Sequence, residues 1–136
     1  SLGHAQVVRV TVPSAKLPDF TKTFLAQLPE RQKATQGPQY RAAIGLRGGM
    51  DSKYFPLIQE VCEGKVKLVN GEGNEPDTFD TDVVYVYDAR RFPWRPAELS
   101  NQFRDDPPNY YEKDYKEIYE KQKRLGILLR TGCPGE

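Results

Sequence analysis

Two periods of apolar residues run through the first third of this chain. From position 8 to position 12 valines alternate with polar residues, which predicts a half-buried strand that ends at Pro13, with three inward-facing side chains, Val8, Val10 and Val12. The next apolar residues recur every three or four positions and predict a helix with one apolar face, formed by Leu17, Phe20, Phe24, Leu25 and Leu28. Pro18 suits the first turn of this helix, and Pro29 follows its last apolar position.

A second strand and a second helix are predicted in the middle of the chain. Residues 30–39 form a polar loop, after which alternate residues share one face of a strand, namely Tyr40, Ala42, Ile44 and Leu46. Gly48 and Gly49 end that strand. Asp51 or Ser52 can cap the following helix, which stops at Gly64 and has an apolar side formed by Tyr54, Leu57, Ile58 and Val61.

The second half predicts two further strands and a long helix. Residues 65–69 are typical of a short edge strand, and residues 70–80 are too rich in Gly, Asn, Asp and Pro to be anything but a loop. The nearly continuous apolar run at 83–87 is typical of a strand covered on both faces. A helix is predicted over 110–129, with a tyrosine-rich face whose helical spacing indicates packing.

The order of these elements is β-α-β-α-β-β, followed by a long C-terminal region. That order indicates an α+β fold, in which helices pack on a small mixed sheet and a long C-terminal helix is added. With 136 residues, the chain is long enough for one domain with a modest core. We therefore predict a single domain over 1–136, with its core at about 3–104 and its helix and tail at about 109–136.

Composition narrows the classes of partner. With 38% hydrophobic and 29% charged residues and a net charge of +1, the chain has no general attraction for nucleic acid or anionic membranes. No apolar run approaches the roughly 20 residues that span a bilayer, and no secretory signal is visible. A soluble, cytoplasmic protein without a nucleic-acid or membrane partner is expected.

The cysteine and histidine content argues against a disulfide scaffold or a metal centre. Cys62 and Cys133 are too few and too far apart for a disulfide framework, and a single histidine, His4, argues against a zinc cluster. Cys62 lies on the apolar pattern of a helix and is predicted to be a buried structural thiol. No metal and no cofactor are therefore expected.

Two short sequence motifs, the first phrase at residues 3–10 and the second phrase at residues 37–44, resemble motifs of a known family. Residues 3–10 read Gly-His-Ala-Gln-Val-Val-Arg-Val, and residues 37–44 read Gly-Pro-Gln-Tyr-Arg-Ala-Ala-Ile. In order, spacing and letters they resemble the methionine sulfoxide reductase A family, where a Gly-His-Ala-Glu strand and a Gly-x-Gln-Tyr-Arg-Ser strand supply much of the active site. Residues 130–135 resemble the family's Thr-Gly-x-Ser-Cys-Pro tail, and residues 92–98 loosely resemble its late aromatic-Pro-Ala-Glu segment.

The resemblance implies a fold, a site and a reductant. The fold would be the ferredoxin-like β-α-β core of that family, and the substrate-binding positions would be Gln6, Thr35 and Tyr40. Trp94 could form an aromatic wall for a methyl-sulfoxide substrate. Cys133 could be a recycling thiol, with thioredoxin or dithiothreitol as reductant. Because the family's N-terminal strand and helix have no counterpart here, the resemblance also implies an exposed sheet edge, which the C-terminal helix, a homodimer partner or an upstream polypeptide would cover.

The departures from the family fall on the residues that carry out the chemistry. The Gly-Cys-Phe-Trp nucleophile segment is not in this sequence, and the acidic positions of the family correspond to Gln6 and Thr35. Sulfoxide reduction needs a thiolate to attack sulfur and an acid to protonate the departing oxygen. An amide such as that of Gln6 donates a hydrogen bond but transfers no proton, so the pattern indicates a degenerate pocket.

Three hypotheses follow for the function. The first is a divergent reductase-like domain without reductase activity, which binds methionine-containing peptides or proteins. The second is a fragment of an active peptide-methionine (S)-S-oxide reductase whose catalytic cysteine lies upstream. The third is a structural or oligomeric interaction protein that retains the fold alone.

Overall fold

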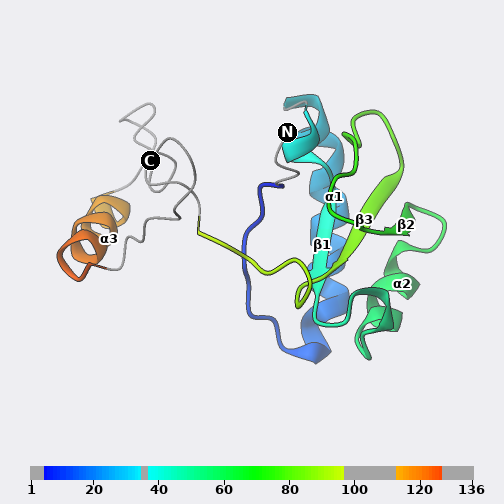
Figure 1. The fold of residues 1–136 in the computed structure, drawn as a ribbon, viewed down its shortest axis with the longest axis horizontal. Coiled ribbons are helices and arrows are strands. Elements are labelled where there is room, and N and C mark those ends of the chain that lie inside the picture. The colour runs from blue at the N-terminus through cyan, green and yellow to red at the C-terminus, as the bar shows by residue number, and fades with distance from the viewer. Residues whose placement is uncertain (1–4, 35–36, 97–112, 127–136) are drawn as a thin grey trace. The chain divides into compact units, whose positions relative to one another are not determined.

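The structure is a computed structural model that describes residues 5–34, 37–96 and 113–126 (Figure 1). The chain forms two compact units, residues 1–94 and 95–136, which are described separately below. The first unit holds helices α1 (Leu17–Ala34) and α2 (Phe55–Cys62) and strands β1 (Ala43–Leu46), β2 (Lys67–Asn70) and β3 (Val83–Asp88). Single 3-10 turns at Ser14–Lys16, Pro38–Tyr40 and Gly49–Asp51 join these elements.

The three strands form a parallel sheet in the order β1-β3-β2. The unit is therefore α+β, as predicted, but the described strands all run one way, so the prediction of a mixed sheet was wrong. Strand direction depends on how connections cross the sheet, and the local pattern of apolar residues does not encode it. The ferredoxin-like core is not confirmed.

The two strand positions in the sheet follow from their sequences. Strand β3 lies between its two neighbours, which explains the almost continuous apolar run that forms it. Strand β2 lies at an edge, as predicted for residues 65–69. Because β2 and β3 are parallel neighbours, the connection at residues 71–82 has to run from the end of β2 back to the opposite end of the sheet, where β3 begins.

The core lies between one face of the sheet and helix α2. Val84 and Val86 of β3 have no exposed surface, and Ile58 and Cys62 of α2 are 1% exposed. Leu68 of β2 is paired with Val84 and lies on the same face of the sheet. Leu68 and Cys62 line one surface hollow beside α2, so α2 covers this face. The buried environment predicted for Cys62 is confirmed.

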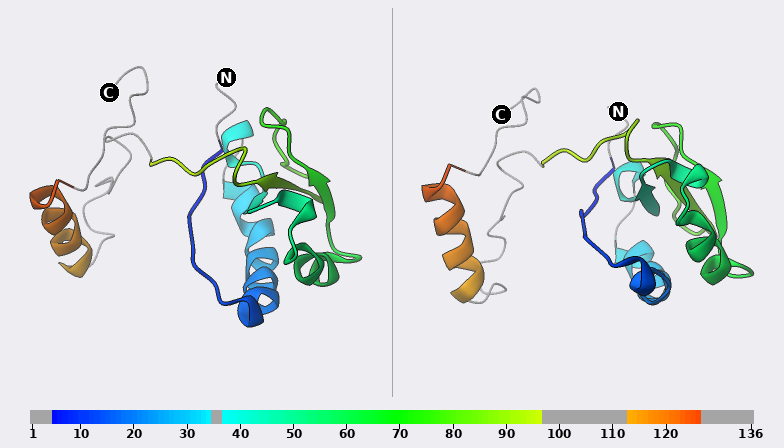
Figure 2. Two further views of the ribbon diagram at one scale, coloured as in Figure 1. Left: turned by 60° about the horizontal axis from the view of Figure 1, so that its bottom comes forward. Right: turned by 90° about the horizontal axis from the view of Figure 1, so that it is seen from below.

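The segment before α1 is not a strand. Residues 5–13 have no regular structure, and two of the valines predicted to face inward are largely exposed, Val8 by 80% and Val10 by 50%. The prediction failed because alternation measures the preference of a segment for the extended form, whereas a strand also needs a neighbour that completes its hydrogen bonds. In Figures 1 and 2 this segment (blue) lies on the β1 side of the sheet, away from β2.

Helix α1 continues beyond the point where it was predicted to end. It includes Pro29 and reaches Ala34, so most of the predicted loop at 30–39 is helical. Proline inside a helix costs about 3 kcal/mol. The residues after Pro29 are Glu-Arg-Gln-Lys-Ala, all strong helix formers, and their preference opposes that cost. The helix predicted after Gly49 was correct and is α2.

The second unit contains one described helix, α3 (Lys113–Arg124), with basic residues in its last turn. It covers twelve residues of the helix predicted over 110–129, and the remaining predicted residues lie outside the described part. The long form of this helix is therefore not confirmed, and the assignment of residues 1–136 to a single domain stays a prediction. Within the described ranges, no helix is long and apolar enough to cross a membrane.

Candidate functional site

The second phrase, residues 37–44, lies at the start of β1 and is held from two sides. Gly37 has φ of 123°, a conformation that favours glycine, and its N–H donates to the carboxylate of Asp77 in the 71–82 connection. The N–H of Ala42 donates to the Thr78 hydroxyl at 2.7 Å, and Thr78 is 2% exposed. The 71–82 connection thereby fixes the course of the second phrase on one side.

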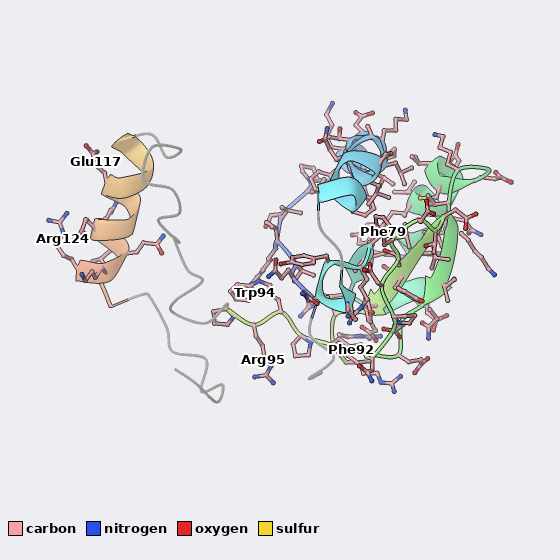
Figure 3. All side chains as sticks on the ribbon, turned by 90° about the horizontal axis from the view of Figure 1, so that it is seen from above. Phe79, Phe92, Trp94, Arg95, Glu117 and Arg124 are labelled. Atoms are coloured by element: carbon pink, nitrogen blue, oxygen red, sulfur yellow. The ribbon has the colours of Figure 1, made fainter. Side chains whose placement is uncertain are left out.

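The first phrase contacts the second phrase through one backbone hydrogen bond. The N–H of Gln6 donates to the carbonyl of Gln39, the neighbour of Tyr40, at 2.7 Å. Three residues beyond Gln6, the Arg9 guanidinium lies over the Trp94 ring, 5.9 Å from its centroid. Figure 3 shows Trp94 on the stretch that follows β3. One extended segment therefore adjoins both the second phrase and the aromatic residue that sequence singled out.

The structure describes three of the five residues predicted for the site. Gln6 is exposed, Tyr40 is half-buried, and Trp94 is 48% exposed. Thr35 and Cys133 lie outside the described residues. Two hollows, of about 480 and 430 Å³, lie elsewhere, one between α1 and the start of β3 and the other beside α2. Neither hollow is lined by Gln6, Tyr40 or Trp94.

A buried polar cluster, formed by Arg41, Tyr87 and Glu75, lies directly beside the second phrase and was not predicted. Arg41 is 4% exposed, and its Nε donates to the Tyr87 hydroxyl at 2.7 Å. The Tyr87 hydroxyl donates in turn to the Glu75 carboxylate, whose Oε2 lies 3.8 Å from Arg41 Nε. The two terminal nitrogens of Arg41 donate to the carbonyls of Pro38, at 2.7 Å, and Gly73, at 3.3 Å.

This cluster joins three segments that are distant in sequence. Arg41 precedes β1, Tyr87 belongs to β3, and Glu75 belongs to the 71–82 connection. The Tyr87 ring also lies so close to Gly71 that a Cβ there would come within 2.4 Å of it. The cluster and this close contact hold the connection across the sheet, which in turn fixes the residues that bind Gly37 and Ala42.

Electrostatics in the cluster favour a neutral phenol beside a charged carboxylate. Burial and the hydrogen bond to Glu75 raise the pKa of Tyr87 to about 12, against the opposing effect of Arg41. Burial acts to raise the pKa of Glu75, but the hydrogen bonds from Tyr87 and from backbone N–H groups lower it overall. Tyr87 is therefore protonated and able to donate at neutral pH.

The raised pKa of Tyr87 makes stability fall at alkaline pH. A phenol that binds its proton more tightly in the folded state stabilises the fold fully below its unfolded pKa of about 10. That contribution is lost as pH rises through about 12, its value in the folded protein. We expect the free energy of unfolding of the Tyr87→Phe variant, measured by urea unfolding, to fall less between pH 8 and pH 11 than that of the wild type. The Tyr85→Phe variant, changed on the same strand, should lose as much as the wild type. An equal loss in both variants and wild type would contradict this assignment.

Cys62 is poorly suited to be a nucleophile. Its side chain is 1% exposed, and burial raises the pKa of its thiol against the opposing charge of Lys65. Burial and the raised pKa both reduce the amount of thiolate, which is the form that attacks a substrate. Among residues 5–34, 37–96 and 113–126, no group of three or more His, Cys, Asp or Glu side chains is placed to hold a metal ion.

The sequence contained only a weak signal for the buried cluster. Arg41 lies inside the second phrase, yet an arginine between Tyr40 and Ala42 is equally typical of an exposed strand position. Its burial depends on Glu75, which belongs to a loop whose path no local pattern predicts.

Comparison of the chain with protein-family models, curated proteins and solved structures finds no match. The two phrases and the contacts between the segments that carry them are therefore the features of the chain that bear on its function.

Proposed function

We propose that this chain is a divergent domain of the methionine sulfoxide reductase A type, which binds methionine-containing peptides in oxidised form without reducing them. The hydrogen bond from the Gln6 N–H to the Gln39 carbonyl is the observation that carries the proposal, because it joins the two phrases that resemble the family. Gln6, Tyr40 and Trp94 would contact the peptide, with Tyr40 and Gln6 donating hydrogen bonds to the sulfoxide oxygen and Trp94 contacting the methyl group.

The chemistry of the described residues supports binding over reduction. Gln6 has an amide where the reaction needs an acid, so it can hold the oxygen but cannot protonate it. The one cysteine in the described part of the chain, Cys62, is buried and has a raised pKa. Neither of these residues supplies the steps that sulfoxide reduction requires.

Two other functions stay open as proposals. A catalytic cysteine upstream of the first phrase would make the whole protein an active peptide-methionine (S)-S-oxide reductase, with thioredoxin as reductant. An interaction protein, including a homodimer, is favoured by the exposed valines Val7, Val8 and Val10. Reductase activity of a longer protein would support the first alternative, and a dimer without peptide affinity would support the second.

Titration of Trp94 fluorescence tests the proposal, because Trp94 is the single tryptophan of the sequence. We expect a peptide with methionine-S-sulfoxide to change this fluorescence saturably. Tyr40→Phe should weaken the affinity by about 2- to 10-fold, the value of one neutral hydrogen bond. Tyr54→Phe is the matched control, since Tyr54 is 39% exposed at the start of α2. Equal affinities for the two variants would contradict the proposed site.

The same samples test whether any thiol reduces the peptide. With dithiothreitol as reductant, we expect no conversion of sulfoxide by the wild type or by the Cys62→Ala and Cys133→Ala variants. Conversion that is lost in one variant would identify that cysteine as a nucleophile and would overturn the non-catalytic proposal.

A further inference from the structure

Strand β1 has one side that no described strand covers. The carbonyls of Ala42 and Leu46 accept hydrogen bonds from the β3 side, from Tyr85 N–H at 2.9 Å and Ala89 N–H at 2.8 Å. Because successive residues of a strand direct their N–H and C=O groups to opposite sides, the groups of Ala43 and Gly45 face away from β3. No backbone group within the described ranges bonds to them.

The surroundings of this edge are apolar and positively charged. The segment at residues 5–13 lies on the same side of the sheet as β1 (Figures 1 and 2). It carries the exposed residues Val7, Val8 and Val10, with Arg9 over Trp94. An added Cβ at Gly45 would have no atom within 4 Å, so the face of the sheet to which this position points is open beside the edge. Arg47 follows β1 directly and is exposed, and neither it nor Arg9 makes an ion pair with the residues described.

We propose that an extended peptide of a partner protein binds by adding a strand to the β1 edge. This inference rests on the proposed function and names how the methionine-containing peptide is held. Backbone hydrogen bonds to Ala43 and Gly45 align the peptide, and its alternate apolar side chains contact the exposed valines and Trp94. An acidic residue at one end of the peptide meets Arg47.

A partner peptide fits this edge better than a second copy of the chain does. Strand β1 has four residues, so any strand added to it, from a peptide or from a second copy, gains few backbone hydrogen bonds, and the side chains beside the edge decide between the two. A second copy would bring residues 41–48 to the edge, and these contain no acidic residue that could meet Arg47 or Arg9. A peptide with an acidic residue meets the same arginines favourably.

Amide hydrogen exchange of the full chain tests the inference. The probe is a nine-residue peptide with methionine sulfoxide at its centre, valines at alternate positions and aspartate at one end. At saturation we expect exchange at Ala43 and Gly45 to slow by at least 10-fold, with no such change at Ile44, whose amide faces β3. Two sets of peptides are N-methylated at alternate positions, one set at the N–H groups that face the β1 edge and the other at the N–H groups that face away. Only the first set should lose affinity, by at least 10-fold.

Charge variants provide a second measurement. Arg47→Ala should weaken binding of the acidic peptide by about 3- to 10-fold at low salt and less at high salt, whereas Lys53→Ala, an exposed cation beside α2, should leave it unchanged. Equal effects of the two variants would argue against charge recognition at this edge.

Each outcome decides between the two proposals. Saturable change in Trp94 fluorescence with no protection of Ala43 and Gly45, and equal effects of both N-methylated sets, would overturn the β1-edge inference and leave the proposed function standing. No fluorescence change at all would overturn both. Slow amide exchange at Ala43 and Gly45 before any peptide is added would show that the edge is already covered, and would also overturn the inference. The cover would be a second copy if this protection rises with protein concentration, and the chain itself if it does not.

Discussion

Replacing Arg41 by methionine is expected to lower the free energy of unfolding by about 3–5 kcal/mol, the cost of removing one partner from a buried charged pair. Arg41 is 4% exposed and donates to Tyr87, Pro38 and Gly73. Without it, the Glu75 carboxylate keeps its charge in a largely buried position, where its side chain is 11% exposed. Urea unfolding at neutral pH measures this loss.

The chain contains a matched control for this prediction. Arg91 pairs with Glu72 of the same 71–82 connection, at 3.3 Å, but their side chains are 64% and 65% exposed. Because an exposed ion pair contributes at most about 1 kcal/mol, Arg91→Met should have little effect. The double variant Arg41→Met/Glu75→Met should be more stable than Arg41→Met alone. Equal losses for Arg41→Met and Arg91→Met would contradict the structural role given to the buried cluster.

Replacing Ile58 by alanine is expected to lower the free energy of unfolding by about 2–5 kcal/mol. Ile58 is 1% exposed and belongs to the short helix α2, which covers the face of the sheet that carries Val84 and Val86. Truncation removes buried apolar surface and leaves a cavity that this small core cannot easily refill. Thermal or urea unfolding measures the loss.

The control for Ile58 lies one position further along the same helix. Gln59 is exposed, and Gln59→Ala changes helix preference only slightly, so its effect should stay within about 0.5 kcal/mol. If Ile58→Ala cost no more than Gln59→Ala, the packing of α2 on the sheet would be wrong.

Elements of the fold that their own residues specify were predicted correctly. The first turns of helix α1, the helix after Gly49, the edge strand β2 and the central strand β3 were all predicted, because their own residues favour the form that they adopt. The apolar face predicted for α1 is borne out only in part, because Phe20 is 44% exposed and the other four residues, Leu17, Phe24, Leu25 and Leu28, are half-buried. The prediction was wrong for residues 5–13, whose alternating valines indicate a strand but which lack a strand neighbour in the structure. The parallel arrangement of the sheet was also missed, since it depends on crossings that no single segment encodes.

The candidate site divides in the same way. The contact between the first and second phrases is compatible with the resemblance that singled them out, and Trp94 adjoins the first phrase through Arg9. The buried cluster was not predicted, because Arg41 and Tyr87 are 46 positions apart and meet only when the sheet has formed. A loop carboxylate such as Glu75 gives no sign in sequence that it will be buried.

The most direct test of the account follows binding and reduction in one sample. The purified chain is mixed with dithiothreitol and peptides that contain either the S or the R diastereomer of methionine sulfoxide. Trp94 fluorescence reports binding, and the peptide mass reports loss of oxygen. We expect saturable binding of the S diastereomer, weaker binding of the R diastereomer and no loss of oxygen from either. Loss of oxygen would contradict a non-catalytic domain, and the absence of saturable binding would contradict a peptide site formed by the two phrases.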